Sequence, residues 1–268
     1  MKSKKVTYNI LALFVANLAY ASHCFAQKLA INELPSITTI PAVKVVSLPD
    51  FSKIADVKTK KEYFFSTLYP IIEEENQHVL SLRKTINALI ELPDLNNEQT
   101  KWLEQVASYY KIKVSQSQSE TIDALLLRVD LIPPALALTQ AAIESGWGAS
   151  RFARKGNNLF GQWCFSKGCG LVPSSRDSEN GHEVAKFSSV NAAVRAYIRN
   201  LNTNAAYKNL RVKRAELRQA NEVLTGVMLA SELSRYSQEK QNYVQKLKRF
   251  LRQNNLQRFN QQFAQVSL

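Results

Sequence analysis

One carboxylate, that of Glu144, stands at the end of an apolar run. The surrounding residues read LTQAAIESGWGASRF from Leu138 to Phe152. If the run is a buried helix, removal from water and the negative end of the helix dipole both disfavour ionisation of Glu144. We therefore expect a raised pKa for this side chain. A carboxylic acid that keeps its proton near neutral pH can protonate the leaving oxygen of an acetal as the bond breaks.

The residues that follow Glu144 leave a simpler interpretation open. Arg151 or Arg154 could form an ion pair with this carboxylate, which would make it a structural charge. Trp147 and the glycines on either side of it favour the catalytic interpretation, because they keep the surroundings apolar and let a substrate approach the backbone. The residue types alone do not decide between the two.

A longer pattern around Glu144 is typical of a known enzyme family. The segment reads LALTQAAIESGWGASRFARKGNNLFGQWC, and HEVAKF, YIRNLNTNAAYKNLR and YSQEKQNYVQKL follow downstream. This compound signature resembles the bacterial endo-β-N-acetylglucosaminidases of glycoside hydrolase family 73, most closely their periplasmic Bax-like members. The resemblance covers about residues 130–251. It implies an α+β fold that is mostly α, a lysozyme-like domain with a small β-hairpin lobe, and Glu144 as the general acid.

The resemblance leaves the second catalytic group open. On the predicted hairpin, Glu183 is the first candidate and Asp177 the second; the alternative for Glu183 is a salt bridge with Arg176 or Lys186. A third route needs no protein carboxylate, because the acetamido group of the sugar can stabilise the developing cation. Tyr236 matches a family tyrosine that would orient this group, and its alternative is half-buried packing.

Five further residues are predicted to bind the substrate. They are Trp147, Asn158, Phe160, Trp163 and Tyr197. In relatives the matching asparagine and phenylalanine shape the floor of the cleft, and exposed aromatic rings can stack on sugars. Each has an ordinary alternative, since an asparagine after Gly156 also fits a helix end and the aromatic rings also fit a core.

The N-terminal part of the chain divides by its patterns. Residues 1–26 carry three lysines, then an apolar run, and then small residues near Ala26 where a signal peptidase could cut. This order is typical of a cleaved secretory signal. A membrane anchor is the alternative, but its apolar run would have to be longer. The chain should therefore be periplasmic or secreted. Prolines at 35, 41 and 49 predict an extended arm or linker over residues 27–58.

Helical periodicity then predicts a helical N-terminal segment over residues 59–129, in which Pro70 should kink or restart a long helix. Asn96, and Ser117 with Glu120, have the types and spacing of helix caps. The catalytic domain should span residues 130–258, followed by a C-terminal tail at 259–268. Its central helix should begin at Pro133 and Pro134 and end at the glycines after Glu144.

Two cysteines remain after the signal segment. In an oxidising compartment, Cys164 and Cys169 would close a small disulfide loop, worth about 2 kcal/mol in the chain-entropy model. A zinc site with His182 as third ligand is the alternative, but it lacks a fourth partner. We therefore expect no metal, and the resemblance implies no cofactor.

The positive charge of the chain lies late in the sequence. The formal net charge is +13, and residues 186–268 hold fifteen Lys and Arg against four Glu. These residues either form a solvated helix face or attract an anionic polymer. The partner would be peptidoglycan glycan strands or another anionic envelope surface. No nucleic acid is expected, because no basic run is interleaved with aromatics, and nothing in the sequence names a protein partner.

These observations predict an exported peptidoglycan hydrolase that cleaves β-1,4 bonds after N-acetylglucosamine. Amidase activity is not expected. The alternatives are a lytic transglycosylase on the same fold and a catalytically silent wall-binding protein. In a further alternative, residues 59–129 dock a partner or inhibit the enzyme.

Overall fold

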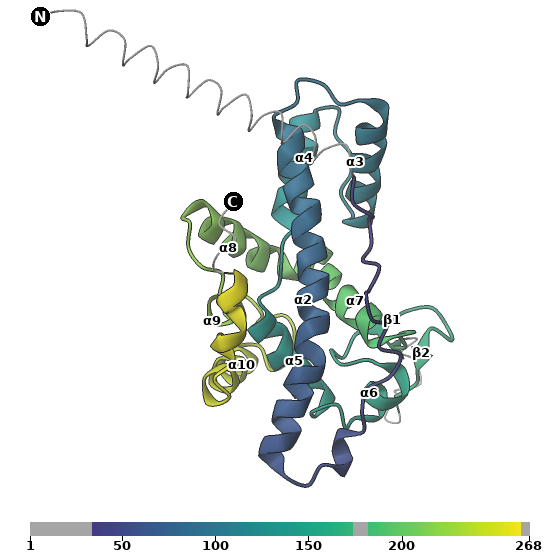
Figure 1. Ribbon diagram of the computed structural model, residues 1–268, viewed down its shortest axis with the longest axis vertical. Helices are drawn as coiled ribbons and strands as arrows, with labels where there is room; N and C mark the ends of the chain where they lie inside the picture. The colour runs from purple at the N-terminus through teal and green to yellow at the C-terminus, as the bar shows by residue number, and fades with distance from the viewer. Residues whose placement is uncertain (1–33, 174–181, 264–268) are drawn as a thin grey trace, which may run out of the picture.

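The computed structural model describes residues 34–173 and 182–263, arranged around one long helix (Figure 1). The elements in chain order are η1 (Phe51–Lys53), α2 (Val57–Ile90), α3 (Asn97–Tyr109), α4 (Gln118–Arg128), α5 (Pro134–Ser145), α6 (Arg151–Gly156), β1 (Trp163–Cys164), β2 (Gly170–Leu171), β3 (Glu183–Ala185), α7 (Val190–Thr203), η2 (Ala205–Tyr207), α8 (Lys208–Gln219), α9 (Gly226–Ala230), α10 (Gln241–Gln253) and η3 (Leu256–Phe263). The predicted class, α+β and mostly α, is confirmed. No helix of the described ranges is long and apolar enough to cross a membrane.

The long helix α2 runs through Pro70 without interruption, so the restart predicted there does not occur. Proline removes one hydrogen bond, to the carbonyl four residues earlier, which is that of Ser66. Both Pro70 and Ser66 are exposed, so water can satisfy the carbonyl that the proline leaves free. The apolar stripe on the other side of α2 stays buried from Phe64 to Leu89.

Helices α3 and α4 pack beside the end of α2 that lies at the top of Figure 1. Their starts follow the predicted caps. Asn96 and Gln99 exchange both bonds of a capping box at the start of α3. Ser117 caps α4 by accepting the N–H of Glu120, but the Glu120 carboxylate binds the Ser115 hydroxyl instead of closing the box.

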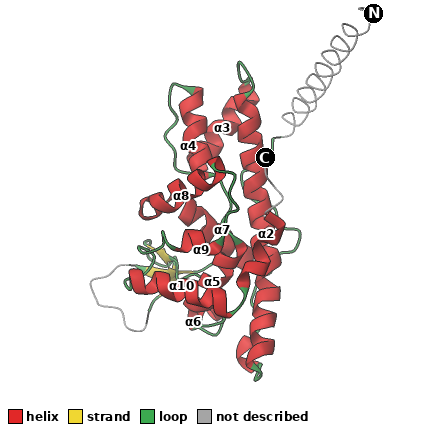
Figure 2. Cartoon of the chain, turned by 90° about the vertical axis from the view of Figure 1, so that its left-hand side faces the viewer, coloured by secondary structure: helices red, strands yellow, loops and turns green. Residues whose placement is uncertain are grey.

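Helix α5 carries Glu144 and lies at the centre of the lower lobe, the part of the molecule that α5, α9, α10 and η3 form with the lower half of α2 in Figure 1. As expected it begins at Pro134, and Gly146 ends it in the left-handed conformation at φ 57°. Its apolar residues from Ala135 to Ala142 are buried nearly all round, against α2, α9, α10 and η3. In Figure 2 this helix lies between α2 and a small sheet.

The small sheet has the strand order β1-β3-β2, and both pairs are antiparallel. Its register pairs Trp163 with Val184 and Gly170 with Ala185. A Cβ on Gly170 would lie 2.0 Å from the carbonyl oxygen of Val184, so only glycine fits at this crossing. The sequence Asn180-Gly181, which is typical of a hairpin turn, lies outside the described residues.

One apolar core joins the N-terminal helices to the predicted catalytic domain, since it runs from Phe51 to Leu256. Asp130 stands where the two parts meet and is 2% exposed. Its carboxylate accepts two hydrogen bonds from Arg218 and lies 3.7 Å from Arg214 and 3.8 Å from Arg83. The division predicted at residue 130 therefore falls inside a shared core.

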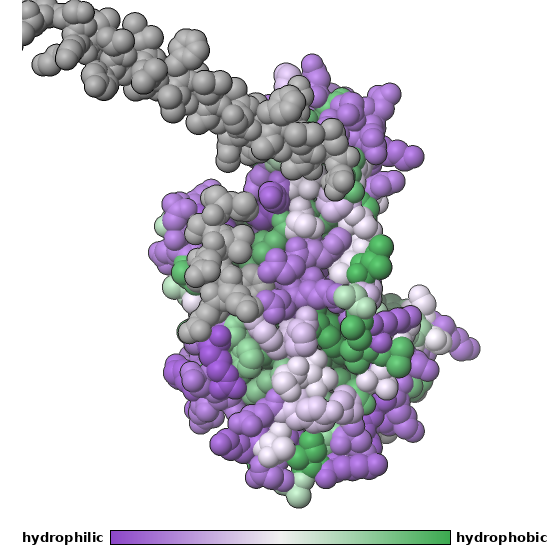
Figure 3. Space-filling model, viewed as in Figure 1, coloured by the Kyte–Doolittle hydropathy of each residue, from purple (hydrophilic) through white to green (hydrophobic). Residues whose placement is uncertain are grey.

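The predicted arm is extended and packed against the helices from residue 34 onward. The Pro35 carbonyl accepts a hydrogen bond from the Trp102 indole at 2.7 Å, and Phe51 is 1% exposed. Between them, the Val45 carbonyl accepts from the N–H of Val190 at 2.8 Å. Apolar side chains of the arm also face outward, and Figure 3 shows green residues along its course. The arm thus links α3, α7 and the lower lobe.

Several of the Lys and Arg residues in the range 186–268 are buried or paired within the fold and do not belong to a basic surface. Arg211 and Arg214 are 4% and 1% exposed, and Arg195 pairs with the buried Glu75 at 2.9 Å. Burial raises the pKa of that glutamate, and its bonds to Thr39 and Arg195 oppose the effect. The basic face predicted to attract an anionic polymer is therefore smaller than the residue count suggests.

Candidate active site

The side chain of Glu144 is half-buried in the last turn of α5. Burial raises the pKa of this carboxyl; the hydrogen bond from Tyr243 and the charge of Lys246 oppose the shift, and the charge of Glu239 adds to it. In the described part of the chain Glu144 forms no ion pair with Arg151, which instead donates to the Val172 carbonyl. Arg154 forms no ion pair with Glu144 among the described residues either, so neither of the two arginines neutralises this carboxyl group.

A chain of hydrogen bonds ends on one oxygen of Glu144. The Tyr197 hydroxyl donates to Gln140 Oε1 at 2.7 Å, and Gln140 Nε2 donates to the Tyr243 hydroxyl at 3.1 Å. Tyr243 in turn donates to Glu144 Oε1 at 2.7 Å. Gln140 and Glu144 are four residues apart on α5, so they share one face of the helix. This chain fixes the orientation of the carboxyl group.

The other oxygen of Glu144 lies near the lining of an open cavity of about 450 Å³, although Glu144 is not itself one of the described lining residues. A Cβ added at Gly161, one of the lining residues, would lie 3.6 Å from Glu144 Oε2. The described lining residues are Lys111, Phe160, Gly161, Gln162, Trp163, Phe165, Ala196, Arg199, Asn200, Thr203, Asn204, Tyr207 and Tyr236. The carboxyl group therefore lies beside Gly161, which belongs to the lining of a cleft with polar and aromatic side chains.

Tyr236 lines this cavity and packs beside Tyr243, the residue that donates a hydrogen bond to Glu144. Its ring is parallel to that of Tyr243, with the centroids 5.6 Å apart, and its hydroxyl donates to the Phe160 carbonyl at 2.8 Å. Burial raises the pKa of Tyr236 well above its ordinary value, so the phenol stays neutral. Tyr236 thus holds the loop that carries Gly161 in place.

The predicted substrate-binding residues separate into exposed and buried ones. Trp163 lines the cavity, is 50% exposed, and meets His182 edge to face. Tyr197 is fully buried, and its ring stacks on that of Phe160 with centroids 4.0 Å apart. Asn158 is 2% exposed and donates to the carbonyls of residues 162 and 185. Trp163 is therefore exposed at the cavity, whereas Tyr197, Phe160 and Asn158 pack or hydrogen-bond within the loop that leads to it.

Trp147 faces away from this cavity's lining, toward α2. Its ring packs against Phe64, Phe65 and Phe250, and the Lys61 ammonium lies 5.2 Å above it. The residue itself adopts a positive φ of 61° directly after the glycine that ends α5. It anchors the end of the Glu144 helix to the long N-terminal helix.

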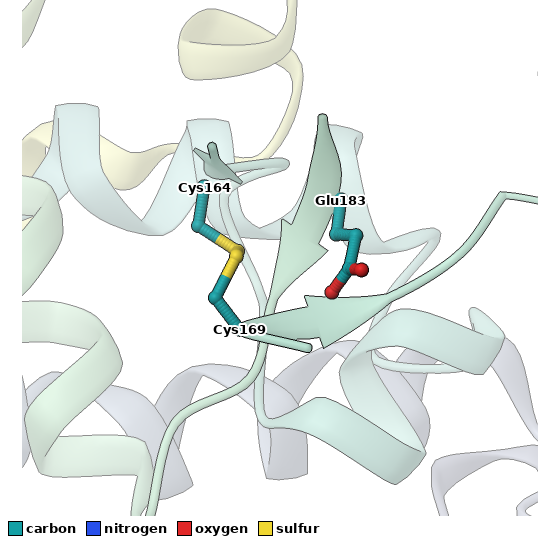
Figure 4. Close-up of side chains that lie close together, drawn as sticks. All are labelled: Cys164, Cys169 and Glu183. Atoms are coloured by element: carbon teal, nitrogen blue, oxygen red, sulfur yellow. A yellow bond between two sulfur atoms is a disulfide. The ribbon is translucent and has the colours of Figure 1, made fainter. Parts of the chain in front are cut away.

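Glu183, the first candidate for a second carboxylate, lies in the sheet beside a disulfide (Figure 4). Cys164 and Cys169 are bonded to each other, so the zinc alternative has no free thiolates. Glu183 is 5% exposed and accepts the N–H groups of Gly168 at 2.9 Å and Gly170 at 2.8 Å. This arrangement holds the loop between β1 and β2. The second candidate, Asp177, lies outside the described residues.

Sequence reasoning missed Tyr243 and Gln140, which hold the Glu144 carboxyl group. A signal for Gln140 existed, because a lone amide four residues before Glu144 in an apolar helix needs a buried partner. Tyr243 had no comparable signal, since only the fold brings α10 against α5. The same holds for Lys111, which comes to the cavity from the N-terminal helical segment.

Comparisons with known proteins agree with the motif around Glu144. A family model described as mannosyl-glycoprotein endo-beta-N-acetylglucosaminidase matches residues 120–256. Protein bax of Escherichia coli (strain K12) is 34% identical over 203 residues, which cover 75% of this chain and 72% of that protein. The catalytic domain of the autolysin Auto from Listeria monocytogenes superposes with a TM-score of 0.37 at 19% identity, over 65% of this chain and 93% of that domain, a likeness too remote to carry an argument. The family match and the bax relative together show that this chain belongs to the glucosaminidase family, glycoside hydrolase family 73.

Proposed function

We propose that the protein is an exported peptidoglycan hydrolase that cleaves the β-1,4 bond after N-acetylglucosamine, with Glu144 as the general acid. The observation that supports this role is the two-sided environment of the carboxyl group. Oε1 accepts the Tyr243 hydroxyl, and Oε2 lies beside Gly161 at the cavity. Membership of a glucosaminidase family supplies the substrate class, and the predicted signal at residues 1–26 supports export.

The direction of the hydrogen bonds supports one position for the acid proton. Gln140 donates to the Tyr243 hydroxyl, so the single proton of that hydroxyl goes to Glu144 Oε1. Oε1 is then an acceptor, and the proton of the neutral acid resides on Oε2. This is the oxygen that lies beside Gly161, a residue of the cavity lining, where the leaving oxygen of a bound sugar would receive the proton.

For the second half of the reaction, the geometry favours assistance by the substrate's own acetamido group. Both oxygens of Glu183 accept backbone N–H groups, which favours a carboxylate that stabilises the hairpin loop. The acetamide route needs only the acid and a cleft that orients the N-acetyl group. Tyr236 and Trp163 are the aromatic residues on the cavity wall that would do so. Asp177 stays the alternative for a protein nucleophile or base.

The experiment is digestion of purified peptidoglycan with the wild type, Glu144→Gln and a matched control, Glu216→Gln. Glu216 is an exposed acid that pairs with Lys213 on α8. Removal of a general acid costs about 10²–10⁴-fold in rate, and the control should digest like the wild type. Mass spectrometry should find new reducing ends on N-acetylglucosamine.

Three results would contradict the proposal. Anhydro-muramic ends would identify a lytic transglycosylase instead of a hydrolase. Equal digestion by the wild type and Glu144→Gln would remove the general acid from the mechanism. Binding of the wild type to the wall without any glycan release would identify a wall-binding protein.

A further inference from the structure

The cavity lining carries positive charge. Gly161, one of the lining residues, lies beside Glu144, and Lys111 and Arg199 are the charged members of the described lining, which includes no acid. The acetal and the N-acetyl groups of a glycan strand are neutral, so the bond that is cut gives no reason for positive charge there. Two uncompensated cations in a cleft attract an anionic group of the ligand.

Arg199 is held in place by its contacts with Tyr109. Its Nε donates to the Tyr109 carbonyl at 2.9 Å, and its guanidinium lies 4.3 Å from the centroid of the Tyr109 ring. Its two terminal nitrogens donate to no residue in the described part of the chain. A guanidinium anchored through Nε presents these two nitrogens as a planar fork, which is the geometry that binds a carboxylate.

Lys111 reaches the same cavity from a different part of the fold. It follows α3 directly, with a positive φ of 57°, and its carbonyl accepts a hydrogen bond from Arg128 at 2.9 Å. Its side chain is exposed. Residue 111 lies before the family match, which begins at residue 120. The N-terminal helical segment thus contributes a charge to the wall of the cleft.

We propose that Lys111 and Arg199 form an anion subsite for the carboxylates of the peptide stem on the muramic acid unit, so that the preferred substrate is peptide-substituted glycan. This inference rests on the proposed function. In a strand cut after N-acetylglucosamine, the next unit is the muramic acid sugar, and its lactyl group carries the stem. The carboxylates of such a strand belong to the stem and not to the sugar rings. Asn200 and Asn204 also line this cavity and offer amide donors and acceptors for the peptide backbone.

The test compares two substrates that share one glycan and one stem: intact peptidoglycan fragments, and the same fragments after carbodiimide and ammonium chloride have converted the stem carboxylates to neutral amides. The measured quantity is the preference, the ratio of kcat/KM for the intact to the amidated fragments. An exposed ion pair is worth up to about 1 kcal/mol, so Lys111→Met should lower the preference about fivefold, through KM. Arg199→Gln should lower it about tenfold, because a charge-assisted hydrogen bond is stronger.

Lys113→Met is the matched control. Lys113 is an exposed lysine two residues along the chain and is not among the described lining residues. The Lys113→Met variant removes the same charge as Lys111→Met and should keep the wild-type preference. The preference of the wild type should also fall as salt is added, because exposed charges are screened.

The outcomes separate the two proposals. An unchanged preference in Lys111→Met, or an equal fall in Lys113→Met, overturns the subsite and leaves the proposed hydrolase intact. A wild type that cuts amidated fragments as well as intact ones also overturns it. Release of glycan from neither substrate overturns the proposed function, and the subsite with it.

Discussion

The ion cluster around Asp130 gives the sharpest prediction for the fold, through Asp130→Asn. Arg218 binds both carboxylate oxygens, and Arg214 and Arg83 complete the cluster. Arg214 is 1% exposed, so the substitution leaves a buried guanidinium without its anion. Loss of one partner from a buried pair costs about 3–5 kcal/mol. Arg214 keeps its bonds to the carbonyls of Leu131 and residue 128, so we expect about 3 kcal/mol.

The assay is chemical or thermal unfolding of the full chain, with Glu216→Gln as the surface control. A loss of 3 kcal/mol should lower Tm by about 6–12 °C for a chain of this size. The control removes an exposed pair and should change the free energy of unfolding by about 0–1 kcal/mol. The two variants remove the same charge, so the difference between their losses of stability isolates the effect of burial.

The same variant should change the response to acid. The neighbouring guanidinium groups hold the pKa of Asp130 below its ordinary value, although burial opposes them. A folded-state pKa below the unfolded one stabilises the fold above the unfolded value, about 3.9, and the stabilisation is lost as pH falls through the folded pKa. Asp130→Asn should lack this acid-dependent part. A loss of under about 1 kcal/mol at pH 7, with an unchanged acid response, would refute the reasoning.

Three further predictions concern the site and its supports. In Tyr243→Phe, the pKa of Glu144 should rise further, because the carboxylate loses a hydrogen-bond donor. The alkaline limb of the pH profile of kcat should therefore move to higher pH. An unmoved limb would contradict this role of Tyr243. Replacement of Cys164 and Cys169 by serine should cost about 2 kcal/mol of stability by denaturant unfolding, and reductant should then have no further effect on the variant. Gly148→Ala should cost at least about 2 kcal/mol, because a Cβ there would lie 2.7 Å from Phe51 at a φ of 76°; wild-type stability would show that the arm is not packed on this glycine.

The helical frame could be predicted because its signals are local. The apolar run before Glu144, the prolines at its start and Gly146 at its end are enough to define α5, and Asn96 defines the start of α3. Burial of Glu144 also followed from this run. Pro70 shows the limit of a local rule, because its cost depends on which face of α2 meets water.

The site's supports could not be predicted in the same way, because they depend on contacts between distant segments. Tyr243 lies 99 residues after Glu144 in the sequence. The placement of Trp147 against α2 needed the long helix to cross the end of α5. An aromatic residue next to a catalytic acid fits both a sugar contact and a packing contact, and its neighbours decide which one forms.

The arm at residues 34–56 has a consequence for the order in which the chain folds. Its contacts are among the most distant in sequence: Val45 binds Asn191 across 146 residues, and Thr39 binds Arg195 across 156. Such contacts carry the largest loop-closure entropy and are expected to form late. We therefore expect the segment that leaves the ribosome early to dock only after α7 has been synthesised and packed. A protease added during refolding should then cut the arm after the helices have become resistant.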